Sequence, residues 1–312
     1  MKLFSKFPIS VCGLALALAS LGNLIAQYGA FLRYFCGILS FIILLLFTIG
    51  ALTNLKLFIK EFDNPVALGV LITYSMAIIV LSTYVKPFIG VFAVFIWLVA
   101  IVLHFLIMLL FLIKQVFKFK IANVFPTWFI PAVGVVVISG TAPAMNMVLL
   151  GQIMFCLGFL LYFIMLFVIL YRMIKIKGIP ESARPTVVIF AAPVSLCLVG
   201  YFSSFTNVSI FLVLFMFVIC VISYIYALIA MSRLIMSKFY PTFSAFTFPM
   251  VISAAAFKVT LTFLFGNSSV LTTIISLVTL IIAVIVVLVV IYRFCRVWFN
   301  MPPSLDTPGR TK

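Results

Sequence analysis

The chain has 312 residues, of which 67% are hydrophobic and only 8% are charged. A soluble domain carries roughly a quarter of its residues as charged side chains, and a disordered chain is far less hydrophobic. Both classes are therefore excluded, and an integral membrane protein remains.

Ten apolar segments follow one another along the chain, each close to the length of about 20 residues that a membrane helix needs. They cover residues 8–27, 34–53, 65–84, 88–112, 125–141, 147–171, 185–202, 208–231, 241–263 and 270–292. A transmembrane β-barrel is excluded, because its strands would alternate polar and apolar residues. The sequence predicts an all-α polytopic membrane protein with ten transmembrane helices in the lipid bilayer.

The basic residues divide unevenly between the two sides of such a protein. Only Arg33 and Lys86 fall on one side, and Lys258 lies inside a segment. The other side receives Lys2, Lys6, Lys56, Lys60, Lys114, Lys118, Lys120, Arg172, Lys175, Lys177, Arg184, Arg233, Lys238, Arg293, Arg296, Arg310 and Lys312. Cytoplasmic loops collect Lys and Arg, so we expect both termini in the cytoplasm and a multi-pass protein of the cell (plasma) membrane. The net charge of +16 then reports orientation, and no nucleic acid partner is predicted.

Every odd-numbered segment begins with a proline, and these prolines recur at intervals of about 56–61 residues. One such proline is unremarkable, because the first helical turn does not need its N–H group. Five in one register indicate a repeated unit. We therefore predict a single membrane domain, residues 1–300, followed by a short cytoplasmic tail, 301–312. Its repeats cover approximately residues 8–60, 65–118, 126–178, 185–236 and 241–296. Because Pro8 begins the first repeat, we expect the N-terminal segment to be retained.

Each repeat contains two helices, so all five repeats have the same orientation and can close into a ring. Within the odd segments a further proline or glycine follows, at Pro131, Gly134, Pro193 and Pro249. A proline inside a helix leaves a carbonyl unpaired, which is tolerated at membrane depth only against protein or a water-filled cavity. We therefore expect five helical hairpins around a central pore, lined by the odd helices.

Three stretches carry a resemblance to a known family: Phe125–Trp128 (FPTW), Arg184–Pro193 (RPTVVIFAAP) and Ser244–Met250 (SAFTFPM). They resemble the tellurite-resistance/dicarboxylate transporter (TDT) family, which includes bacterial TehA and the plant guard-cell slow anion channels. The resemblance extends over the whole chain in span number, repeat length and proline placement. It implies five hairpins around one pore in each subunit, and assembly as a homotrimer.

The resemblance also implies that a phenylalanine of the ninth span blocks the pore. The matching residue is Phe248, or Phe246 if the register is shifted. The repeat supports Phe248 independently, because the equivalent positions in the other four repeats hold smaller side chains: Ala15, Ile72, Val133 and Ala192. The alternative is that Phe248 is one of 36 phenylalanines and packs against a neighbouring helix.

Two ionisable residues lie within the predicted spans. Lys258 is expected near the outer end of its helix, where it either attracts anions or extends to the interface. His104 lies in an even helix, where a neutral histidine bonded between helices is commoner than a proton relay. The four acidic residues lie outside the spans, at Glu61, Asp63, Glu181 and Asp306.

The missing acidic residues narrow the mechanism. Proton-coupled carriers use carboxylates within the membrane, and cation pores use acidic rings. The sequence has no nucleophile with its base, no metal-binding cluster and no phosphate-binding loop. We therefore predict neither an enzyme nor a cofactor nor a metal site. Backbone groups and hydroxyls would favour anions instead, and the candidates are Thr73, Ser139, Ser195 and Thr247.

The sequence thus predicts passive conduction of small inorganic or organic anions through a pore gated by a phenylalanine. The alternative is a secondary transporter that exports or exchanges C4-dicarboxylate, sulfite or tellurite.

Overall fold

The computed structural model describes residues 7–176 and 178–300, and within them the chain is helical apart from turns and loops. Nine helices of this part are long and apolar enough to cross a membrane, and one bent pair of shorter helices adds a tenth. The predicted ten spans are confirmed. The predicted tail, 301–312, and the lysines Lys2, Lys6 and Lys177 lie outside the described residues.

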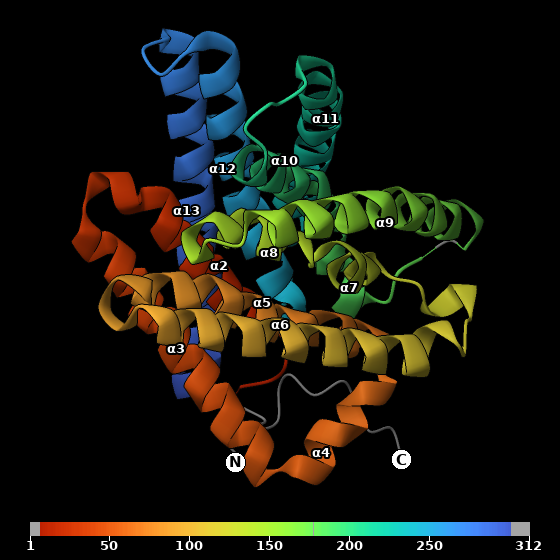
Figure 1. Cartoon of the computed structure of the whole chain (residues 1–312). Helices are drawn as coiled ribbons and strands as arrows, with labels where there is room; N and C mark the ends of the chain where they lie inside the picture. Colours follow the sequence, from red (N-terminus) through yellow and green to blue (C-terminus); the bar gives the residue numbers. More distant parts are fainter. Residues whose placement is uncertain (1–6, 177, 301–312) are drawn as a thin grey trace, which may run out of the picture.

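The spans form five consecutive hairpins, and Figure 1 shows α5 beside α6 and α12 beside α13. The pairs are α2 (Val11–Ile25) with α3 (Ala30–Thr53), α5 (Pro65–Ile89) with α6 (Val91–Phe111), the bent pair α7 (Phe129–Val133) and α8 (Val136–Thr141) with α9 (Val148–Lys175), α10 (Ala192–Ser204) with α11 (Ile210–Leu234), and α12 (Thr247–Phe265) with α13 (Val270–Asn300).

Two of the hairpins turn at glycines whose backbone has a positive φ, a conformation that only a residue without a side chain adopts easily. Gly90 has φ 54° between α5 and α6, and Gly266 has φ 80° after α12. Positive φ costs a glycine little, because it has no Cβ to meet the backbone. These corners let antiparallel helices follow each other without a long loop. We use "far side" for the end of the bundle with these corners. We use "basic side" for the other end, where the connections 54–64, 117–125 and 178–184 lie.

The odd spans close into a ring. In order around it, α2 contacts α5, α5 contacts α7 and α8, α8 contacts α10, α10 contacts α12, and α12 returns to α2. The even helices lie outside this ring. In α9 and α11 28% of the central residues are buried, against 78% in the span Glu181–Ser204. An outer helix exposes apolar side chains because lipid solvates them, so the predicted inner and outer rings are present.

Three inner spans begin as a 3₁₀-helix and change to an α-helix at depth. The 3₁₀ segments are η5 (Pro126–Trp128), η7 (Glu181–Ala191) and η8 (Pro241–Phe246). After η7 and η8, the α-helix starts just before Pro193 and Pro249. Proline fits the first turn of an α-helix, where its missing N–H is not needed. The second prolines therefore mark the points where the helix type changes.

The fifth span is the most strongly broken. α7 and α8 meet at an angle of 51°, and the break falls at Gly134 and Val135. Pro131 stands near the start of α7 and is buried. By contrast, α5 runs without a break from Pro65 through its membrane-spanning length.

The structure also contains a helix that hydropathy did not predict. After α3 the chain forms α4 (Leu55–Lys60) and the 3₁₀ turn η2 (Glu61–Asp63), which lead into α5. Asn64 caps α5, because its side-chain oxygen accepts hydrogen bonds from the backbone N–H groups of Val66 and Ala67. The predicted basic loop is therefore a fixed elbow at the basic side.

Candidate functional site

Three cavities follow one another along the axis of the ring. The middle one, the central cavity, has a volume of only about 50 Å³, which holds a few water molecules. All five inner spans contribute to its wall, through Gly13, Val70, Thr73, Met76, Val133, Gly134, Ala192, Pro193, Phe248 and Pro249. The ring of odd helices therefore encloses a lumen with a narrow middle.

The two outer cavities are several times larger. The basic-side vestibule has a volume of about 640 Å³, and the far-side vestibule about 290 Å³. Val70 and Thr242 line both the basic-side vestibule and the central cavity. Leu196 and Phe248 line both the central cavity and the far-side vestibule. The shared residues show that the three cavities lie in series.

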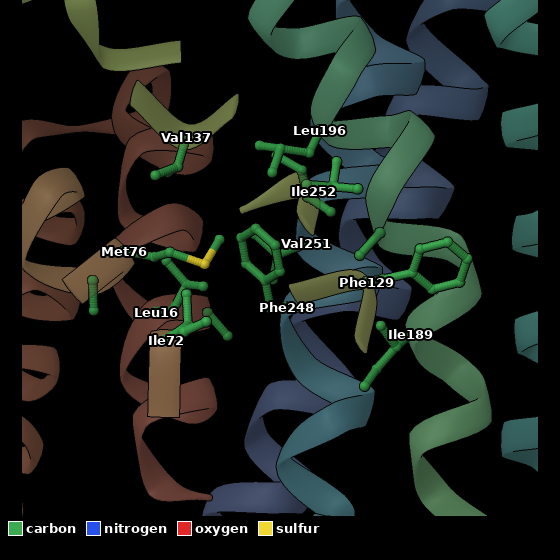
Figure 2. Packing of buried hydrophobic residues seen from close by; sticks show 14 of the residues in the cluster. Leu16, Ile72, Met76, Phe129, Val137, Ile189, Leu196, Phe248, Val251 and Ile252 are labelled. Carbon is green, nitrogen blue, oxygen red and sulfur yellow. The ribbon is translucent and has the colours of Figure 1, made fainter. Parts of the chain in front are cut away.

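Phe248 stands at the junction of the central cavity and the far-side vestibule. Its side chain is 9% exposed. Figure 2 shows its ring pointing from α12 towards Met76, with Leu16, Ile72 and Leu196 around it. The small volume of the central cavity makes the lumen narrow at this level. Because the side chains around the ring are apolar, they offer an ion few polar partners.

The repeat register explains part of this arrangement. Val133 and Ala192, which are equivalent to Phe248 in their repeats, also line the central cavity. Ala15 and Ile72 are fully buried and are not among its lining residues. Phe248 therefore faces the lumen together with two of the four smaller residues at equivalent positions, Val133 and Ala192.

Phe246, the other predicted candidate, lies elsewhere. It is fully buried, and its ring centroid lies 4.9 Å from that of Phe243 in the same 3₁₀ segment. It lines none of the three cavities. Phe246 therefore packs between helices.

The predicted break residues differ in their positions. Gly134, Pro193 and Pro249 line the central cavity, whereas Pro131 does not. A Cβ atom on Gly134 would approach the Met76 sulfur to 2.9 Å, which is closer than ordinary van der Waals contact. Gly134 therefore lets α5 approach the bend between α7 and α8.

The hydroxyl groups expected to face an anion are mostly used within the protein. Each donates to a backbone carbonyl oxygen at 2.6–3.0 Å, in Thr73, Ser139, Ser195 and Thr247. Only Thr73 of these four lines the central cavity. The other three hydroxyls bond their own helix or tie inner helices together, as Ser195 does with Ser253 of α12 at 3.0 Å.

Lys258 lines the far-side vestibule. Its ammonium group donates a hydrogen bond to the side-chain oxygen of Gln27. Asn23 lines the same vestibule and accepts a hydrogen bond from the guanidinium of Arg33 at 3.0 Å. Among the described residues no carboxylate lies within 4.0 Å of either cation, so the far-side rim is electropositive.

His104 lies behind the lumen wall. It is fully buried in α6, and its Nδ1 atom is 3.1 Å from the Ser75 hydroxyl of α5. Its Nε2 atom has no hydrogen-bond partner within the described part of the chain. A bond between neighbouring helices agrees with the commoner role expected for this histidine. No group of three metal-binding side chains occurs in the residues described.

Two charged residues that the sequence analysis placed outside the spans, without proposing them as site residues, have distinctive surroundings at the basic side. Glu61 lines the basic-side vestibule. Arg172, on α9, is 3% exposed; it donates to the Gly178 carbonyl at 3.2 Å and lies 5.3 Å from the ring centroid of Phe125. Arg172 does not line the vestibule. No sequence motif indicates that Glu61 does, because the segments that form this vestibule are far apart in the chain.

Comparison with known proteins agrees with this architecture. A family model described as voltage-dependent anion channel (SLAC1) matches residues 6–295. A search of curated proteins found no match. The family match covers almost the whole chain and confirms the resemblance to the TDT family. The chain is thus a multi-pass membrane protein that belongs to the voltage-dependent anion channel family, a family of anion channels and transporters.

Proposed function

We propose that the protein conducts small inorganic or organic anions passively through the lumen of its helix ring, and that Phe248 is the gate. The observation that carries this proposal is the position of Phe248, which lines both the narrow central cavity and the far-side vestibule. An apolar constriction excludes an ion by keeping water out, and a side chain that moves away opens it.

The preference for anions rests on charge. Lys258 stands at the far-side vestibule with no carboxylate within 4.0 Å among the described residues. The acidic residues that the structure describes, Glu61, Asp63 and Glu181, lie at helix ends and not deep within a span. An ion that enters the lumen meets hydroxyl and apolar side chains, which hold it weakly and let it leave.

The proposal includes a membrane setting. The basic side faces the cytoplasm, both termini lie there, and the protein resides in the cell (plasma) membrane, because Lys and Arg gather in cytoplasmic loops. The resemblance to the TDT family supports a homotrimer with a lumen in each subunit.

Replacement of the gate tests the proposal. Phe248→Ala removes the ring from the junction and is expected to raise anion current about tenfold or more, since a hydrophobic barrier of about 1.4 kcal/mol changes a rate tenfold. The measurement is anion current through purified protein in planar bilayers.

A matched control lies on the same helix. Phe257 of α12 is 8% exposed, packs against Phe217 and Tyr224 of α11, and lines no cavity of the lumen. Phe257→Ala should leave the current near the wild-type level. If Phe248→Ala folds, inserts and conducts no more than Phe257→Ala, Phe248 is not the gate.

A further inference from the structure

Glu61 places a negative charge in the basic-side vestibule, at one mouth of the proposed anion pathway. The basic-side vestibule and the central cavity contain one charged residue among the described residues that line them, and this residue is Glu61. A carboxylate at the entrance of an anion pathway repels the ion that has to pass. An anion pore with a fixed negative charge at one mouth therefore needs a reason for keeping it.

The local structure holds Glu61 in place. It follows α4 directly, and its carbonyl oxygen accepts a hydrogen bond from the backbone N–H of Asn64 at 3.1 Å. Asn64 in turn caps α5, which forms part of the lumen wall. Glu61 is thus held by the elbow between α4 and α5, and it is half-buried.

Within the described part of the chain, no charged side chain of the elements packed against η2 forms an ion pair with Glu61. On α4 the charged side chains are Lys56 and Lys60, and neither lies within 4.0 Å of the Glu61 carboxylate. On the short helix η3 (Leu112–Val116), Lys114 binds Asp63 instead, at 3.0 Å. The lysine of α5, Lys86, stands at the far end of that helix.

Among the residues that the structure describes, the opposite walls add no charged side chain. They contribute backbone, hydroxyl and amide groups through Ser10, Asn123, Ser182 and Thr242. Glu181 and Arg184 of η7 are exposed and do not line the vestibule.

Burial raises the pKa of Glu61 above its ordinary value of 4.5, and the neighbouring charge of Lys60 opposes part of that change. A carboxyl group with a raised pKa gains its proton at a higher pH than an exposed one. Acidification at the basic side therefore neutralises Glu61 at a higher pH than an ordinary exposed glutamate.

We propose that Glu61 controls the entry of anions from the basic side: its carboxylate repels anions in the vestibule, and its protonation removes that barrier. This inference rests on the proposed channel function. Together with Lys258 at the other mouth, it makes the lumen electrostatically asymmetric, so anions enter more readily from the far side at neutral pH.

Single-sided pH changes test the inference. Anion current is measured in planar bilayers for Phe248→Ala, whose lumen is expected to be open, at about 30 mM salt, where charges are weakly screened. Lowering the pH of the chamber at the basic side from about 7.5 to about 5 increases the protonated fraction of a carboxyl group with a raised pKa. The current is expected to rise roughly two- to threefold, as removal of one nearby charge predicts.

Three further substitutions, each added separately to Phe248→Ala, test whether the Glu61 carboxyl group causes the response. Glu61→Gln should give the high current at both pH values, whereas Glu61→Asp should keep the pH response. Asp63→Asn is the control, because Asp63 lies on the same turn and lines no cavity. It should behave like the parent. Every other titratable group is present in both the parent and Glu61→Gln, so the difference between these two variants reports Glu61 alone.

Two results would overturn the inference, and they differ. If the parent conducts anions and Glu61→Gln shows the same pH response, Glu61 does not control entry, although the channel function stands. If neither the wild type nor Phe248→Ala carries anion current when folded and inserted, the channel function fails and the inference fails with it.

Discussion

Three side chains differ from others of their type in what surrounds them. Phe248 reaches the lumen, whereas Phe257 of the same helix packs against α11. Lys258 lines one vestibule and Glu61 the other, and each is the charged residue of its wall within the described chain. A charge in a cavity with low-dielectric protein walls acts on a nearby ion more strongly than a charge in open solvent.

The role of Lys258 can be tested by salt dependence. Lys258→Ala removes a positive charge from the far-side vestibule, so anion current at low salt should fall roughly twofold. The difference should vanish near 1 M salt, where the screening length is about 3 Å. The measurement is conductance against salt concentration.

Lys86→Ala is the control for this charge. Lys86 lies at the same side, in the last turn of α5, and lines none of the cavities. Equal currents in Lys258→Ala and the wild type at every salt concentration would mean that Lys258 only extends its ammonium group to the interface.

At the scale of the element, the bend between α7 and α8 is packed closely against its outer partner α9. α9 packs against the bend of α7 and α8 through Gly158, where a Cβ atom would lie 2.3 Å from Val136 Cγ2 and 3.0 Å from Val135 Cγ2. Valine is branched at Cβ and has little freedom to move aside. The glycine thus permits a bent inner helix and a straight outer helix to pack closely.

Two glycine substitutions should therefore change stability in opposite directions. Gly158→Ala is expected to destabilise the protein by about 1–3 kcal/mol, the usual cost of overpacking. Gly140→Ala, in α8, meets nothing within 4 Å, so it should be neutral or stabilise by up to about 1 kcal/mol through helix propensity. Thermal unfolding in detergent measures both. A higher melting temperature for Gly158→Ala would contradict the packing described here.

At the scale of the whole molecule, the ring of five inner spans makes a lumen that is wide at both ends and narrow in the middle. The narrow part lies where α12 places Phe248 against α5 and α10. In the proposed channel, the two vestibules would keep an ion hydrated until it reaches the constriction. A single short barrier of this kind suits passive conduction better than tight binding.

Passive conduction makes a prediction for the intact protein. With a tenfold gradient of one permeant anion, the reversal potential should lie at about 59 mV and should not move when a pH gradient is added. The measurement is current against voltage in reconstituted bilayers. Anion accumulation against its gradient, driven by pH, would instead show a coupled carrier such as a dicarboxylate, sulfite or tellurite exporter.

The sequence by itself determined the ten spans, their pairing and the inner position of the odd helices. Apolar runs of membrane length have few alternatives in lipid, and prolines at depth require a protein or water-filled surrounding. It also separated Phe248 from most other phenylalanines, because the repeat places a large ring opposite smaller residues.

The tertiary structure decided what hydropathy cannot express. Phe248 and Phe246 are two residues apart on either side of the start of α12, and the packing of the helices decides that Phe248 lines the cavities while Phe246 packs against Phe243. Glu61 belongs to the vestibule because the elbow of α4 and η2 turns under the ring and meets loops from distant repeats. The positions of Phe248 and Glu61 depend on contacts between segments that are far apart in the sequence. A pattern along the chain gives no information about these contacts.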